Sequence, residues 1–247
     1  MEMNILVTND DGYKSEGIRT LVKSLALFGD VYVCCPHKQQ SASSMSISIN
    51  KKIKIHLPEN IVGAKRTVTI EGTPSDCISV ALKEFKVDFD LCVSGINFGH
   101  NLANDIFYSG TIGAARQARL KEIHSIAVSA ANPNAPYIYD ALNSFFDYIF
   151  DTKLYKGDHI LNVNFPSINF NKTKGFKLTK LGKKLHNSDF IYDENKKVYI
   201  TKYSSKKFIE DINSDVAAVE DGYISITPIS FDNTDHSFLD KISKKNL

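Results

Sequence analysis

The chain has 247 residues, enough to bury a full hydrophobic core without disulfides or structural metals. Its 30 basic and 28 acidic residues leave a net charge of +2, which argues against a dedicated binder of nucleic acid polymers or membrane surfaces. No apolar run approaches the roughly 18 residues of a membrane span, the chain starts without a signal-peptide pattern, and its four cysteines form no C-x-x-C pair. We therefore expect a cytoplasmic protein with reduced thiols.

The first half of the chain alternates between predicted strands and predicted helices. Short apolar runs predict strands at residues 5–7, 31–35, 68–70, 91–93 and 126–128. Apolar residues recur at helical spacing over residues 18–25, and Gly29 is the expected C-terminal cap of this helix. The same spacing recurs over residues 77–85, where Thr73 is the expected N-cap and Pro74 the first helical residue. Apolar strands separated by amphipathic helices indicate an α/β, doubly wound, parallel sheet covered on both faces.

The second half predicts a different arrangement. It contains an aromatic-rich helix at 137–151, strands at 160–165, 176–181 and 223–227, a hairpin of residues 190–192 and 198–200, and a frayed lysine-rich end at 241–247. A lone hairpin is marginal in water, so it should pack on another surface, such as a second subunit. We expect residues 1–135 to form the core that carries the site and residues 136–247 to continue it within one domain.

Polar clusters punctuated by glycine follow four of the predicted strands. They are Asn-Asp-Asp-Gly at 9–12, Ser-Ala-Ser-Ser at 41–44, Gly-Thr-Pro-Ser-Asp at 72–76 and Ser-Gly-Ile-Asn at 94–97. In an open α/β sheet, ligands bind beyond the carboxyl ends of the strands. We therefore expect the four clusters to converge at one edge of the sheet.

The neighbouring carboxylates of Asp10 and Asp11 can face a common point because the chain turns at Gly12. Two like charges this close repel unless a cation or a shared proton intervenes. Together with the Ser41 hydroxyl and the Asn97 amide oxygen, they form an oxygen-rich set suited to Mg²⁺ or Mn²⁺. The alternative is that residues 10–12 are only a β-turn and helix cap.

A second candidate feature is the run of small residues Ser109, Gly110 and Thr111 before a predicted helix. Backbone N–H groups at the positive end of a helix can bind an anion, although an ordinary Ser/Thr cap has the same sequence pattern. His100, close to Asn97, either contacts substrate or is a solvated loop residue. The chain lacks the G-x-G-x-x-G, P-loop, G-x-S-x-G and H-E-x-x-H patterns, so dinucleotide, P-loop, α/β-hydrolase and zinc-hydrolase chemistry have no support.

Six ordered segments carry a family resemblance. They are residues 9–12, 36–43, 72–77, 94–97, 108–111 and 221–228, so the similarity extends from residue 3 to about residue 228. In this order they resemble the survival protein SurE family of metal-dependent 5′/3′-nucleotidases. The resemblance implies a Rossmann-like core and a C-terminal hairpin, near residues 190–200, that is exchanged between the subunits of a homodimer or homotetramer.

The activity implied by the resemblance is hydrolysis of nucleoside 5′-monophosphates, and of 3′-monophosphates, with one divalent cation per subunit, Mg²⁺ or Mn²⁺. The metal ligands would be Asp10, Asp11, Ser41 and Asn97, and the two aspartates would also be catalytic. The phosphate or substrate contacts would be Asn9, Ser43, Ser109, Gly110 and Thr111. The nucleophile would be either a metal-activated water or the Asp10 carboxylate.

Two departures from the family pattern bear on substrate preference. Ala42 stands where the family usually has glycine, and Asn104 stands where it usually has a carboxylate. Two other functions remain open. A haloacid-dehalogenase-type phosphatase normally separates its two aspartates by one residue, whereas here they are adjacent. A non-enzymatic, Mg²⁺-dependent phospho-receiver module would carry its acceptor aspartate after a later strand, where this chain has Asn97.

Overall fold

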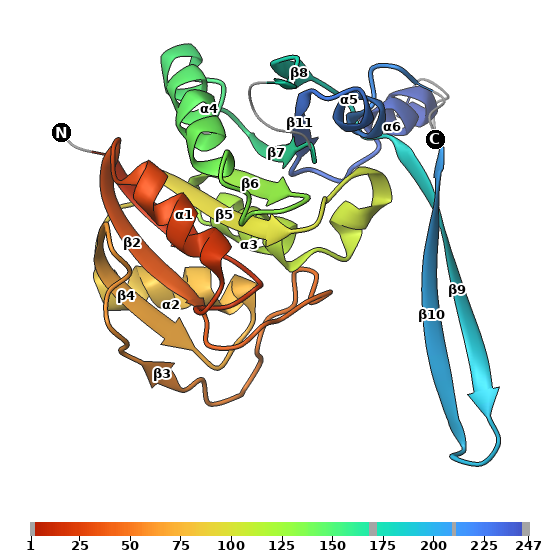
Figure 1. The fold of residues 1–247 in the computed structure, drawn as a ribbon, viewed down its shortest axis with the longest axis horizontal. Helices are drawn as coiled ribbons and strands as arrows, with labels where there is room; N and C mark the ends of the chain where they lie inside the picture. Colours follow the sequence, from red (N-terminus) through yellow and green to blue (C-terminus); the bar gives the residue numbers. More distant parts are fainter. Residues whose placement is uncertain (1–2, 168–171, 209–210, 244–247) are drawn as a thin grey trace.

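In the computed structural model, which describes residues 3–167, 172–208 and 211–243, a nine-stranded sheet crosses the molecule (Figure 1). Its order is β3 (Ile55–His56), β4 (Ala64–Ile70), β2 (Gly29–Pro36), β1 (Met3–Thr8), β5 (Leu91–Phe98), β6 (His124–Ala130), β7 (His159–Phe165), β11 (Ile224–Ser230) and β8 (Phe176–Leu178). Neighbouring strands are parallel except in the β3–β4 and β7–β11 pairs. The predicted α/β class with a mainly parallel sheet is confirmed.

Helices cover both faces of this sheet. They are α1 (Glu16–Leu25), α2 (Pro74–Phe85), α3 (Gly110–Leu120) and α4 (Ile138–Thr152), and a 3₁₀ helix, η1 (Ala103–Phe107), leads into α3. On one face α1 packs beside α4, and on the other α2 packs beside α3. Because successive strand residues point to opposite faces, Ile5 and Val7 join the first core and Leu6 joins the second.

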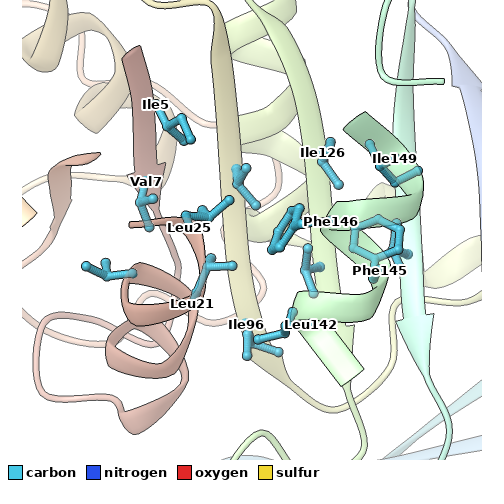
Figure 2. Close-up of a cluster of buried hydrophobic side chains, with 14 of the residues drawn as sticks. Ile5, Val7, Leu21, Leu25, Ile96, Ile126, Leu142, Phe145, Phe146 and Ile149 are labelled. Atoms are coloured by element: carbon cyan, nitrogen blue, oxygen red, sulfur yellow. The ribbon is translucent and has the colours of Figure 1, made fainter. Parts of the chain in front are cut away.

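Figure 2 shows the first of these cores. Leu21 and Leu25 of α1 face the strands, and Phe145 and Phe146 of α4 reach the same layer of side chains. The Phe145 and Phe146 rings are both fully buried, with centroids 5.1 Å apart in an edge-to-face arrangement. Aromatic residues of the predicted 137–151 helix therefore anchor α4 to the sheet.

The predicted hairpin is present and longer than expected. β9 (Lys183–Asp193) and β10 (Val198–Phe208) pair antiparallel as a separate two-stranded sheet that projects from the body of the molecule (Figure 1). Two short helices that the sequence patterns did not predict, α5 (Asp215–Glu220) and α6 (His236–Ser243), lie near its base. Among the described residues, no helix combines the length and apolar character needed to cross a membrane.

Three local predictions are wrong. Helix α1 ends at Leu25 with Ala26 as its cap, so Gly29 is not the cap and instead begins β2, where a Cβ would lie 2.2 Å from the Met3 carbonyl oxygen. The strand predicted at 176–181 stops at Leu178 because Lys180 donates its N–H to Asn213 beside α5. Residues 241–243 belong to α6 rather than to a frayed end, and residues 244–247 lie outside the described residues.

Candidate active site

Asp10 is a nearly buried carboxylate directly beyond β1, with 5 % of its surface exposed. Its Oδ1 accepts a hydrogen bond from Thr111 Oγ1 at 2.7 Å, and its Oδ2 accepts one from Thr111 N at 3.2 Å. Burial raises the pKa of Asp10 to about 6, the Thr111 hydroxyl opposes this rise, and the charge of Asp11 adds to it. Thr111 thus fixes the orientation of a carboxylate that is costly to ionise without a further cation.

Asp11 connects three of the predicted clusters. Its Oδ2 accepts from Phe98 N at 3.0 Å, next to Asn97, and its Oδ1 accepts from Gln39 Nε2 at 3.4 Å. The same Gln39 nitrogen donates to Ser41 Oγ at 2.9 Å. Burial raises the pKa of Asp11, and the Phe98 N–H lowers it. The carboxyl ends of β1, β2 and β5 therefore meet at one place, as their parallel pairing requires.

Gln39 and the backbone N–H of Phe98 are two contacts that the sequence did not reveal. Gln39 lies in an irregular loop with no motif around it, and a backbone N–H carries no residue-specific signal. At Asn97, the side-chain nitrogen donates to Gly99 O at 2.8 Å, a bond that does not use the amide oxygen expected to bind metal. His100 Nε2 is 2.8 Å from the Phe165 carbonyl oxygen, so this ring contacts the end of β7.

The start of α3 packs tightly against Asp10. A Cβ on Gly110 would lie 2.5 Å from Ser43 Oγ and 3.0 Å from Asp10 Cβ, so only glycine fits there. Ser43 Oγ is buried and has no hydrogen-bond partner in the described part of the chain. Ser109 is the N-cap, and its Oγ accepts from Ile112 N at 3.2 Å.

Other predicted residues have structural partners. The Asn9 side chain closes the turn, with Oδ1 accepting from Gly12 N at 3.1 Å and Nδ2 donating to Gly12 O at 3.0 Å. In the 72–76 cluster, Thr73 and Asp76 form a capping box on α2. Thr73 Oγ1 also donates to Ser46 O at 2.6 Å, so this cluster holds the loop that follows Ser43 rather than contacting either aspartate.

The two departures from the family pattern occupy different places. Ala42 adopts the left-handed conformation with φ 54°, a backbone shape that glycine adopts without strain. The Ala42 side chain is exposed. Asn104 lies on η1, and its Nδ2 is 3.4 Å from the carbonyl oxygen of Lys184 at the base of the hairpin. Position 42 therefore shapes the loop beside Asp10, whereas position 104 faces the hairpin.

The donor set fits a hard divalent cation. It offers two carboxylates, a hydroxyl and an amide oxygen, and a cation would relieve both the burial of Asp10 and its repulsion from Asp11. Within the described residues, no group of three or more His, Cys, Asp or Glu side chains is placed to hold a metal. The expected set contains only two residues of those types, so oxygen ligands from Ser41 and Asn97 would complete it.

Comparisons with known proteins point to one family. The family model described as "Survival protein SurE" matches residues 5–188. A relative from Clostridium botulinum (strain Alaska E43 / Type E3), named 5′-nucleotidase SurE, is 37 % identical over 98 % of this chain and 99 % of its own. A relative from Wigglesworthia glossinidia brevipalpis, named 5′/3′-nucleotidase SurE, is 36 % identical over 98 % of this chain and 96 % of its own.

The fold has a counterpart among solved structures. The crystal structure of the SurE protein from Aquifex aeolicus superposes with a TM-score of 0.82 at 30 % identity, and the match covers 99 % of this chain and 100 % of that one. The family match and the full-length relatives therefore agree with the ordered motifs and with the sheet that carries them. The chain belongs to the survival protein SurE family.

Proposed function

We propose that the protein is a metal-dependent phosphomonoesterase that hydrolyses nucleoside 5′-monophosphates, and 3′-monophosphates, to nucleoside and phosphate. The observation that carries this proposal is the pair Asp10 and Asp11, one of them nearly buried, held against the first turn of α3 by Thr111. A pair of like charges, one buried and one half-buried, beside the positive end of a helix suits a cation bound together with an anionic substrate. The names of the full-length relatives support the choice of nucleotides.

One divalent cation, Mg²⁺ or Mn²⁺, would be held by Asp10, Asp11, Ser41 and Asn97, where it would neutralise charge on the phosphate oxygens. Thr111 and the Phe98 N–H keep the two carboxylates oriented. The unpartnered Ser43 hydroxyl donates to a phosphate oxygen, and the positive end of α3 at Ser109 and Gly110 favours the phosphate charge. Asn9 contributes by holding the turn at Gly12.

The test is phosphate release from nucleoside 5′- and 3′-monophosphates by wild type, Asp10→Asn and Asp11→Asn. Wild type should release phosphate with Mg²⁺ or Mn²⁺, lose activity in excess chelator and recover when metal is restored. Each variant should lose activity by about 100-fold or more, because an amide cannot neutralise a bound cation. Asp151→Asn, an exposed change at the end of α4, is the matched control. Release that survives both chelation and the two site variants would contradict the proposal.

We further propose a cytoplasmic homodimer or homotetramer. The location is supported by the four cysteines, all buried and free, which suit a reducing compartment. The assembly is supported by the exposed apolar side chains of the projecting hairpin, including Phe190 and Tyr199, which have 63 % and 66 % of their surfaces exposed.

A further inference from the structure

A small cavity adjoins the candidate active site at the serine loop (residues 41–45). It has a volume of about 110 Å³ and is bounded by residues 44–45 of that loop, residues 106–107 of η1, and Ser109, Gly113 and Arg116. Ser43, the preceding loop residue, lies beside Gly110 and Asp10. The cavity and the candidate phosphate position therefore adjoin the same loop and share Ser109.

Arg116 is a cation without a partner in this cavity. The other three arginines each reach a carboxylate: Arg19 pairs with Glu16 at 4.0 Å, Arg66 with Glu84 at 3.4 Å and Arg119 with Asp158 at 2.8 Å. Arg116 makes no hydrogen bond or ion pair with any described residue, and its Nε is buried and unsatisfied. Burial lowers the pKa of its guanidinium. An anion bound beside this half-buried guanidinium would give the unsatisfied Nε–H a partner and balance the charge.

The position of Arg116 on α3 directs it toward the candidate active site. Long side chains on a helix lean toward its N-terminus, so the guanidinium of Arg116 extends toward the turn that carries Ser109 and Gly113. Met45, Ile106 and Phe107 form the apolar part of the lining, and Ser44, Ser109 and Arg116 form its polar part. The planar guanidinium can offer paired N–H groups to a phosphate.

We propose that this cavity is a second anion subsite in which Arg116 binds a phosphate group. The phosphate is either the second phosphate of a nucleoside bisphosphate whose first phosphate lies against Ser43 and the start of α3, or free inorganic phosphate. The first source rests on the proposed function, whereas the second does not. In the first case Arg116 contributes to substrate specificity, and in neither case does it take part in breaking the ester bond.

Two measurements on the full-length protein test the proposal. The first is the ratio of kcat/KM for adenosine 3′,5′-bisphosphate to that for adenosine 5′-monophosphate. The second is calorimetric titration with inorganic phosphate, which needs no turnover. Arg116→Met should lower the kcat/KM ratio about tenfold or weaken one phosphate-binding event about tenfold, the effect expected for one charge-assisted contact.

Matched variants separate the subsite from general charge effects. Arg116→Lys keeps the positive charge and should restore part of the lost effect, and Arg119→Met, on the same helix but paired with Asp158, should leave both measurements at wild-type values. A lower kcat/KM ratio identifies the substrate as the source of the phosphate, and a change in the titration alone identifies free phosphate. If Arg116→Met alters neither measurement, the proposal is overturned. An inactive wild type would contradict the proposed function, while the titration would still decide the subsite.

Discussion

Ala42 holds a backbone conformation that favours glycine, next to the loop residue that approaches Asp10. Its φ of 54° lies in the left-handed region, which costs a residue with a Cβ roughly 1–2 kcal/mol. Ala42→Gly should therefore raise the free energy of unfolding by about 0.5–1 kcal/mol, because relief of this strain outweighs the extra freedom that glycine gives the unfolded chain. Urea denaturation of both proteins measures the difference.

Ala26 provides the matched control for that prediction. It is also an exposed alanine, at the C-cap of α1, but its φ is −62°. Ala26→Gly should lower the free energy of unfolding by about 0.5–1 kcal/mol, since the substitution relieves no strain there. If the two substitutions shift the unfolding midpoint in the same direction by the same amount, residue 42 is not left-handed in solution.

Some residues of the candidate site can be predicted from the sequence, and others cannot. Asp10, Asp11 and Asn97 can be selected from the sequence because each belongs to a polar cluster that follows a predicted strand, and parallel pairing brings such strand ends together. Gln39 cannot be selected from the sequence. Its side chain bridges Asp11 and Ser41 only because of the path that the irregular loop after β2 takes. The unpaired state of Arg116 is equally hidden, because it depends on which carboxylates lie nearby in three dimensions.

The same contrast appears among the secondary structure elements. Long elements with periodic apolar residues and strong caps are predictable, as the capping box of Thr73 and Asp76 at the start of α2 illustrates. Two-residue β3 and six-residue α5 are too short to show a period, and tertiary contacts hold them in place. The sequence alone does not identify the role of Gly29, because glycine is favoured both at the C-terminal cap of a helix and where two strands approach closely. In the structure Gly29 has the second role.

Asp215 joins three elements near the base of the hairpin. Its fully buried carboxylate accepts N–H groups from Ala103 of η1 at 2.9 Å, from Gly182 before β9 at 2.8 Å and from Val216 of α5 at 2.8 Å. Asp215→Asn replaces one acceptor oxygen with a donor and leaves a backbone N–H unsatisfied. We expect the free energy of unfolding to fall by about 1–3 kcal/mol, as measured by urea denaturation.

Asp221→Asn is the control for this element-scale prediction, because Asp221 is an exposed aspartate that pairs with Lys174 on the surface. Exposed pairs contribute little, so this variant should unfold with wild-type stability. Asp215→Asn should also reduce kcat, since η1 leads directly into the candidate phosphate-binding segment at Ser109. A variant as stable and as active as wild type would show that Asp215 does not hold η1 in place.

At the scale of the whole molecule, we propose that residues 1–135 and 136–247 form one domain. Strands β7, β8 and β11 of the second segment continue the sheet begun by the first, and α4 packs against α1. Side chains from both segments share one hydrophobic core, including Leu21, Phe145 and Val163. Separate folding of either segment would expose this core, so unfolding should occur as a single transition.

The hairpin is the part of the molecule that this domain does not bury. Near its end, the Tyr192 and Tyr199 rings contact each other at a tilt of 50°, with centroids 4.9 Å apart, and Ile191 pairs with Ile200 in the neighbouring register position. Each of these four side chains has at least 45 % of its surface exposed. Since adjacent positions point to opposite faces, both faces of the hairpin present apolar surface to solvent. An isolated two-stranded hairpin with such faces is stable only when another surface covers it.

A second copy of the chain is the covering surface that we propose, and light scattering coupled to size-exclusion chromatography tests it. Wild type should elute with two or four times the mass of one chain. Phe190→Ser combined with Tyr199→Ser removes two exposed aromatic rings and should shift the protein toward a single chain, because the apolar contact area that holds the copies together is reduced. Lys196→Ser combined with Lys197→Ser changes only exposed charges in the turn and should leave the mass unchanged. A monomeric wild type, or an aromatic variant with the wild-type mass, would exclude the hairpin as the contact between subunits.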